Sequence, residues 1–240
     1  HIFFRLICSL LHILSDRPEH ADTLEQMRTR CEDWMRDNGD LGLLSQYELY
    51  SRAEKKGTPY ALATDTQLNP VDELLDAANV ANRRDPASIG TLKKLLQHDD
   101  CAVRRWGAIG LLALGRTANA AVAELRAALT DNAPDVRLTA AEALCGLGIE
   151  KDALATIREL LTFPDGIIRR EAIFVLVRIG EKARPVLPYL DDALTECPHL
   201  DIWSNNNVSQ AACLLKACLG APCEPDDPFI PYPRTRERPA

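Results

Sequence analysis

One spacing recurs three times in this sequence and constrains its fold more than any other feature. A Val-Arg or Ile-Arg pair stands twelve residues before a glycine in three places: Val103 to Gly115, Val136 to Gly148, and Ile168 to Gly180. The pairs follow one another at steps of 33 and 32 residues. A fixed period of this size predicts a stacked array of repeats.

Two ladders of apolar residues keep the same step. The positions advance by 33, 32 and 33 residues in both ladders, which are Leu92, Leu125, Ile157 and Leu190, and Leu96, Leu129, Leu161 and Leu194. Such a register predicts helix-turn-helix units that bury their apolar faces only by stacking on their neighbours.

The second full unit shows the expected parts. Ala120–Thr130 is predicted to be its first helix, and Asp131–Pro134 its turn, in which Asp and Asn side chains cap and Pro starts a helix. Val136–Leu147 is predicted to be the second helix, which Gly148 ends in a left-handed conformation. The whole chain is therefore expected to be an all-α solenoid.

The residue pattern L-x-x-x-L-x-D…V-R-x-x-A-x-x-x-L-x-x-x-G resembles that of HEAT-type repeats. Its arginines (Arg104, Arg137 and Arg169) fall in the first turn of each second helix, near the turn acids Asp100, Asp131, Asp135 and Asp165. We expect each guanidinium to bond carbonyls and carboxylates of the neighbouring turn and so tie repeat to repeat. The alternative is an arginine-lined groove for an anion. Arg105 and Arg170, the additional basic residues, are the better candidates for surface contacts.

The last repeat departs from this pattern. Val208–Gly220 keeps the interval of twelve, but Ser209 replaces the arginine and the preceding turn is seven residues longer. Terminal repeats are expected to be atypical because they cap the stack. The alternative is that the inserted stretch, Glu196–Asn207, is a contact loop with Trp203 as its anchor and His199 beside it.

Composition supports an α-helical chain. The 240 residues are 46% hydrophobic, 26% charged and only 5% aromatic, which suits closely packed short helices. No stretch alternates with the period of a strand, so no sheet is expected. The net charge of −7 argues against a nucleic-acid partner, because such a partner needs a basic surface.

The eight cysteines do not predict a metal site. No C-x-x-C pair occurs, and Cys197 with His199 offers two ligands without a second pair. Cys145 lies within an apolar run and is expected to be a small buried hydrophobe. Cys213, Cys218 and Cys223 are five residues apart and do not share one helical face.

The regions outside the array divide the chain further. We expect an unassigned fragment end at 1–15, a helical lead-in at 16–68, the array at 69–220 and a Pro-rich tail at 221–240. Residues 1–14 are apolar, but they lack an initiator Met and a cleavage site, and they are too short to span a membrane. We therefore interpret the chain as a fragment or a processed product.

The lead-in is expected to contain two helices before the array. Pro18–Asp37 has an apolar face made by Leu24, Met27, Cys31, Trp34 and Met35, and Asn38-Gly39 ends it. Leu41–Lys56 continues as a second helical piece, Gly57–Tyr60 is a break, and Val71–Asn82 is the helix that begins the stack.

The order of segments carries a second resemblance. Asp22–Leu44 resembles the end of the catalytic region of bacterial sulfatases, and Arg104–Gly115 and Ala140–Gly148 resemble the HEAT-like extension that some sulfatases carry after it. The resemblance covers roughly residues 16 to 220. It implies a protein of the arylsulfatase or N-sulfoglucosamine sulfohydrolase kind, a formylglycine and calcium in an upstream catalytic domain, and a periplasmic or extracellular location.

No catalytic residue can be carried over from that family. Its formylglycine arises in a C/S-x-P/A-x-R motif, which this chain lacks, since Cys223-Glu-Pro225 continues with Asp. Catalytic, cofactor-binding and metal residues are therefore all expected to be absent from this chain, and its partner is expected to be its own upstream catalytic domain or another protein.

Three functions follow from the sequence. The first is the C-terminal HEAT-repeat portion of a sulfatase, which braces the catalytic domain or contacts sulfated substrate. The second is a free-standing HEAT-repeat scaffold that binds proteins. The third is an enzyme whose repeats act directly, such as the repeat-type lyases that attach pigments.

Overall fold

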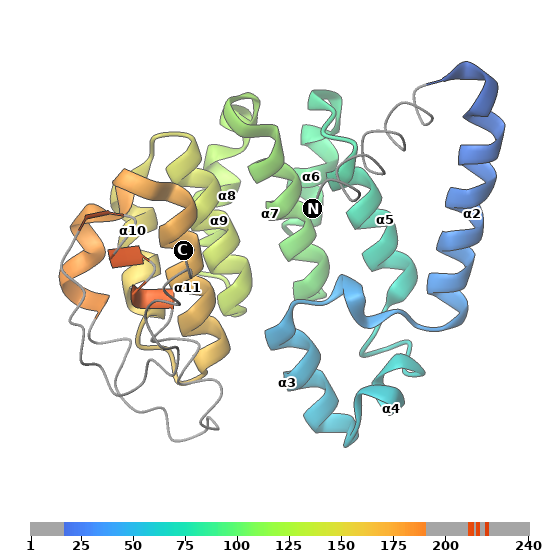
Figure 1. Cartoon of the computed structure of the whole chain (residues 1–240), viewed down its shortest axis with the longest axis horizontal. Helices are drawn as coiled ribbons and strands as arrows, with labels where there is room; N and C mark the ends of the chain where they lie inside the picture. Colours follow the sequence, from blue (N-terminus) through green and yellow to red (C-terminus); the bar gives the residue numbers. More distant parts are fainter. Residues whose placement is uncertain (1–16, 191–210, 214, 217–218, 221–240) are drawn as a thin grey trace, which may run out of the picture. The chain divides into compact units, whose positions relative to one another are not determined.

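The structure is a computed structural model, which describes residues 17–190, 211–213, 215–216 and 219–220. Within these residues all regular structure is α or 3-10 helix, and no strand occurs. The predicted all-α class is confirmed (Figure 1).

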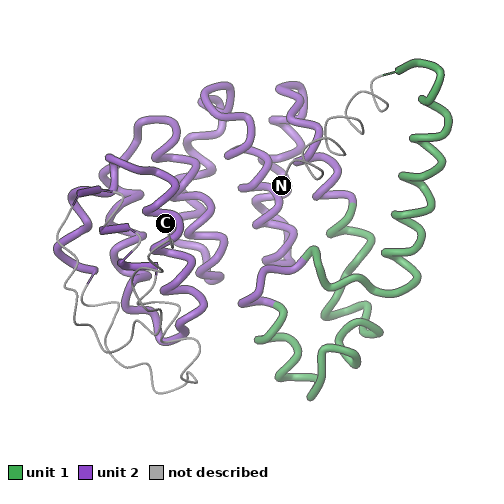
Figure 2. The backbone as a smooth tube through the Cα atoms, viewed as in Figure 1, with its two compact units in different colours: residues 1–43, 49–75 green, residues 44–48, 76–240 purple. Residues whose placement is uncertain are grey.

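The chain divides into two compact units (Figure 2). Unit 1 comprises His1–Leu43 and Leu49–Leu75, and unit 2 comprises Leu44–Glu48 and Asp76–Ala240. The chain thus enters unit 2 for five residues, returns to unit 1, and enters unit 2 again within a helix.

Unit 1 contains one 17-residue helix and several shorter ones. They are η1 (Pro18–His20), α2 (Ala21–Asp37), η2 (Leu41–Leu43), α3 (Gln46–Lys56) from its fourth residue onward, α4 (Pro59–Ala63) and the start of α5 (Val71–Asn82). The predicted bounds of α5 are confirmed. The predicted break at Gly57–Tyr60 is too long, because Thr58 accepts a hydrogen bond from the Ala61 N–H at 3.1 Å and starts α4 at Pro59.

Gly39 fixes the turn that follows α2. Its φ is +57°, and a Cβ atom on it would lie 1.8 Å from the carbonyl oxygen of Ala63. The Asn69 side chain, in a residue only 1% exposed, donates a 3.0 Å hydrogen bond to the Gly39 carbonyl. Only glycine can therefore occupy this turn, which the α4–α5 connection packs against.

Unit 2 is a stack of helix pairs. After the remainder of α5, its elements are η3 (Pro86–Ser88), α6 (Ile89–Leu95), α7 (Cys101–Leu114), η4 (Gly115–Ala121), α8 (Val122–Ala128), α9 (Pro134–Gly146), α10 (Glu150–Leu160), α11 (Gly166–Ile179) and η5 (Gly180–Tyr189). The pairs α6/α7, α8/α9 and α10/α11 are the repeats (Figure 1).

The predicted apolar ladder is buried. Leu92 is 1% exposed, and Leu125, Ile157 and Leu190 are fully buried in one continuous core. In the second ladder Leu96, Leu129 and Leu161 are buried too, whereas Leu194 lies outside the described residues. Each repeat therefore completes the core of the next, as the period predicts.

The second helices of the repeats also end where the sequence predicts. Gly115, Gly148 and Gly180 have φ values of +55°, +83° and +61°, which confirms the predicted glycine stops. Asp100 and Asp165 cap α7 and α11 by accepting backbone N–H bonds.

Two details of the second repeat differ from expectation. The predicted helix Ala120–Thr130 is a 3-10 turn, η4, followed by the shorter α8. Asp131 does not cap α9: its carboxylate accepts the Ala133 N–H at 2.8 Å inside the turn, while α9 starts at Pro134 without a side-chain cap. The carboxylate is thereby left pointing to the preceding repeat.

Helix α7 packs closely against α6. A Cβ atom on Gly107 would lie 3.0 Å from the Leu92 carbonyl oxygen and the Leu96 nitrogen, and one on Gly110 would lie 2.3 Å from a Leu92 methyl carbon. Glycine at both positions allows the two backbones to approach.

One described stretch, Cys101–Ala128, is long and apolar enough to cross a membrane by length and composition alone. Here it forms α7, η4 and α8 of the stack, with Val103, Leu111 and Leu125 in the core. Core helices pass the same test, so the stretch is weak evidence for a span.

Candidate functional site

Arg104 joins two successive repeats at the turn edge of unit 2. From the first turn of α7, it donates hydrogen bonds of 2.7 and 2.8 Å to the two carboxylate oxygens of Asp131, and one of 2.7 Å to Asn132. It also donates to the carbonyls of His98 and Asp99, both at 2.8 Å. The hydrogen bond to Asp131 raises the pKa of the Arg104 guanidinium. A bidentate pair of this kind fixes both distance and orientation between repeats.

The other two repeat arginines also bond to turns. Arg137 donates to the Leu129 carbonyl at 3.1 Å and lies 2.8 Å from the Glu159 carboxylate on α10. Arg169, which is 6% exposed, donates to the Phe163 carbonyl at 2.6 Å. All three guanidinium groups are thus engaged with turns or neighbouring helices.

A second set of contacts links the first helices of successive repeats. Lys93 on α6 lies 2.5 Å from Glu124 on α8, and Arg126 on α8 lies 3.4 Å from Asp152 on α10. The hydrogen bond from Lys93 lowers the pKa of Glu124. On α10, Arg158 stacks 3.5 Å over the centre of the Tyr189 ring.

The sequence prediction missed this second set, although the spacing of its basic residues carries a signal. Lys93, Arg126 and Arg158 each follow a residue of the first apolar ladder, and so they share its steps of 33 and 32. A basic residue at this position reaches the first helix of the next repeat.

Arg105 and Arg170, the predicted candidates for surface contacts, belong to α7 and α11. Arg105 Nε is 3.9 Å from an oxygen of Asp135, and Arg170 donates to Gln46 at 2.5 Å and to Glu171 at 3.1 Å. Both arginines are partly buried, so neither presents a freely exposed guanidinium. Asp135 itself, expected as a turn acid near a repeat arginine, is instead a buried residue within α9.

Several predicted contact residues cannot be placed. Trp203, His199 and the long turn Glu196–Asn207 lie outside the described residues. Cys145 is fully buried, as predicted, and its burial raises the pKa of its thiol to about 11. Across the described parts of the chain, no three His, Cys, Asp or Glu side chains are grouped to hold a metal ion.

The comparison with protein families gives one result. The model of HEAT repeats matches residues 75–145 and 122–202, which together span more than half of the chain. The chain belongs to the HEAT-repeat family. No curated protein matches the sequence.

Membership in the HEAT family agrees with the geometry of unit 2. HEAT repeats are helical scaffolds that commonly mediate protein interactions, and their stacked helices present extended surfaces. The engaged arginines and the continuous core identify unit 2 as such a scaffold.

Proposed function

We propose that this chain is the non-catalytic, C-terminal scaffold of a sulfatase, in which it braces the catalytic domain or contacts its sulfated substrate. The calcium and formylglycine of such an enzyme would belong to the upstream domain, and this chain would hold no cofactor.

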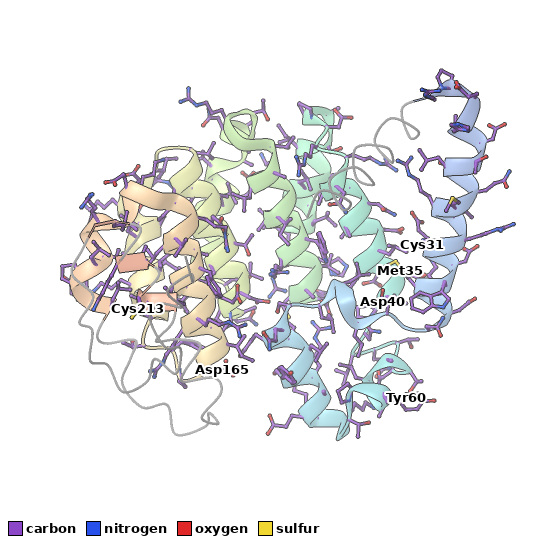
Figure 3. All side chains as sticks on the ribbon, viewed as in Figure 1. Cys31, Met35, Asp40, Tyr60, Asp165 and Cys213 are labelled. Atoms are coloured by element: carbon purple, nitrogen blue, oxygen red, sulfur yellow. The ribbon has the colours of Figure 1, made fainter. Side chains whose placement is uncertain are left out.

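The supporting observation is an exposed apolar face on α2. Met27 is 65% exposed and Trp34 is 59% exposed. Between them in the sequence, at helical spacing, stands Cys31, which is free and exposed and is labelled on α2 in Figure 3. We call these three residues the α2 strip. No residue of α2 is buried. An amphipathic helix that leaves its apolar residues in water is typical of a surface that another protein covers.

The location of the strip connects it to the resemblance. The α2 strip falls inside Asp22–Leu44, the segment that resembles the end of a sulfatase catalytic region. All four large hydrophobic residues that are exposed in the described chain belong to unit 1: Met27, Trp34, Tyr50 and Tyr60. Unit 1 is therefore the better candidate for contact with a second domain.

The second candidate function is a free-standing scaffold for another protein, which the HEAT repeats of unit 2 favour. The two functions differ in what the gene encodes before His1. An upstream reading frame with a C/S-x-P/A-x-R motif supports the sulfatase, and its absence contradicts the sulfatase and leaves the scaffold.

Two measurements on the purified protein test the sulfatase proposal. The purified chain should hydrolyse no aryl sulfate, and turnover that persists through further purification would contradict the non-catalytic role. If the upstream domain exists, Trp34→Ser should weaken its binding to this chain by roughly tenfold or more, as expected for an aromatic anchor. Tyr60→Ser, at a residue 83% exposed on α4 and outside the α2 strip, is the control, and it should not change the affinity if the strip makes the contact.

A further inference from the structure

A buried carboxylate lies at the start of α9. Asp135 is 4% exposed although it stands in the first turn of its helix. One of its oxygens accepts a 2.6 Å hydrogen bond from the Ser45 hydroxyl, and the other accepts the Val136 N–H at 3.0 Å. Arg105 is 3.9 Å away, beyond hydrogen-bond distance. In the described part of the chain, no cation lies within hydrogen-bond distance of this buried carboxylate.

The Asp135 carboxylate is covered by the segment Leu44–Glu48, which we call the latch. Ser45 accepts the N–H of Glu48 at 3.1 Å, and so it caps the start of α3 while its hydroxyl donates to Asp135. The next two latch residues also contact unit 2. Arg170 donates to Gln46 at 2.5 Å, and the Tyr47 ring meets the Phe163 ring edge-on with centroids 6.2 Å apart.

The latch belongs to unit 2, whereas the residues on both sides of it belong to unit 1. It is the short passage at which the chain of unit 1 first becomes part of the repeat stack. A change in the contacts of Leu44–Glu48 therefore changes how firmly this segment is bound within unit 2.

The surroundings of Asp135 disfavour its charged form. Burial is the largest cause and raises the pKa of its carboxyl group, and the nearby Glu48 raises it further, while Ser45, Arg105 and the Val136 N–H act in the opposite direction. The pKa of Tyr47 is also raised, first by burial and then by Glu48. The titratable and charged groups of the cluster are Tyr47 and Glu48 on α3, Cys101 and Arg105 on α7, Asp135 on α9, Asp165 before α11, and Arg170 on α11.

We propose that Leu44–Glu48 is a proton-dependent latch on the repeat array, with Asp135 as its sensor. When the latch is closed, Ser45 and its neighbours exclude water from the carboxylate. When it opens, the carboxylate is hydrated, which stabilises the charged form. A neutral Asp135 therefore favours the closed latch and an ionised Asp135 favours opening.

The sign of the pH dependence follows from linkage. Because the closed state binds the proton more tightly than the open state, closure is firmest below the ordinary aspartate pKa of about 4. It weakens as the pH rises from there through the raised pKa of the closed state. Above the pKa of the closed state, the equilibrium between the closed and the open latch no longer depends on pH.

The test is amide exchange of Glu48 in the full chain, followed by NMR and expressed as a protection factor so that the intrinsic pH dependence of exchange is divided out. Between pH 4 and pH 8 the protection factor should fall by about tenfold for each pH unit by which opening lowers the Asp135 pKa. Asp135→Asn should abolish this trend, whereas Glu48→Gln and Asp165→Asn should keep it.

A second variant covers the case in which Asp135→Asn does not fold. Arg105→Met removes a nearby cation that lowers the pKa of the Asp135 carboxyl group, and it leaves the acceptor of the Glu48 N–H in place, so the pH trend should become steeper. A constant protection factor in the wild type, a trend that survives in Asp135→Asn, or a trend that disappears in Glu48→Gln would each overturn the proposal.

Discussion

Arg178 on α11 donates a hydrogen bond to each carboxylate oxygen of Glu142 on α9, at 2.6 and 2.7 Å. The pair joins the second helices of adjacent repeats, and it raises the pKa of the Arg178 guanidinium. Glu142 is only 8% exposed, whereas about half of the Arg178 side chain reaches solvent. The ion pair therefore consists of a buried carboxylate and a guanidinium group that solvent partly screens.

Removing the arginine should leave that buried end without its partner. We expect Arg178→Met to lower the free energy of unfolding by about 1 kcal/mol, because solvent already screens the cation. Urea unfolding at low and high salt measures this. The double variant Arg178→Met with Glu142→Gln should recover most of the loss, and a further loss in the double variant would contradict a simple pairing.

The close approach of α6 and α7 predicts opposite effects at two helical glycines. Gly107→Ala should destabilise unit 2 by about 1–3 kcal/mol, because the new methyl group would meet the backbone of Leu92 and Leu96. Gly146→Ala, in α9, has no atom within 4 Å of its added Cβ. It should stabilise the protein by up to about 1 kcal/mol through helix propensity. Thermal melts of both variants measure this, and effects of the same sign would contradict the close packing of α7 on α6.

Gly39 and Gly57 offer a matched pair within unit 1. Both have positive φ, +57° and +86°, so an alanine at either position carries a backbone strain of about 1–2 kcal/mol. Only Gly39→Ala adds a clash, with the Ala63 carbonyl. Hydrogen exchange of α2 and α5 should therefore accelerate far more in Gly39→Ala than in Gly57→Ala. Equal acceleration would mean that the turn after α2 is not packed as described.

Leu125 tests the register of the core. It is fully buried in the ladder that the period predicted, so Leu125→Ala should cost about 2–5 kcal/mol of unfolding free energy. A circular-dichroism melt that shows a loss below about 0.5 kcal/mol would place this residue outside a packed core.

The predictable part of this fold is the part that repeats. Leu92 and Leu125 could be assigned to the core, and Gly148 to a helix end, because one local pattern recurs with a fixed step. The shorter α8 was missed because the turn after Gly115 is 3-10, a choice that depends on packing more than on residue type.

The contacts of the latch could not be predicted in this way. Ser45 and Asp135 are 90 residues apart, and Gln46 and Arg170 are 124 apart. No local period relates such pairs. The capping pattern at Ser45 and Glu48 could have indicated the start of α3, but it carries no information on which carboxylate the hydroxyl meets.

The most direct test of the scaffold is the coupling between Arg104 and Asp131. Their side chains are 12% and 9% exposed, and they form the bidentate bridge from α7 to the next repeat. A double-mutant cycle of Arg104→Ala and Asp131→Ala, measured by urea unfolding, should give a coupling free energy of about 1–3 kcal/mol. A coupling within about 0.3 kcal/mol of zero would contradict the claim that these side chains tie one repeat to the next.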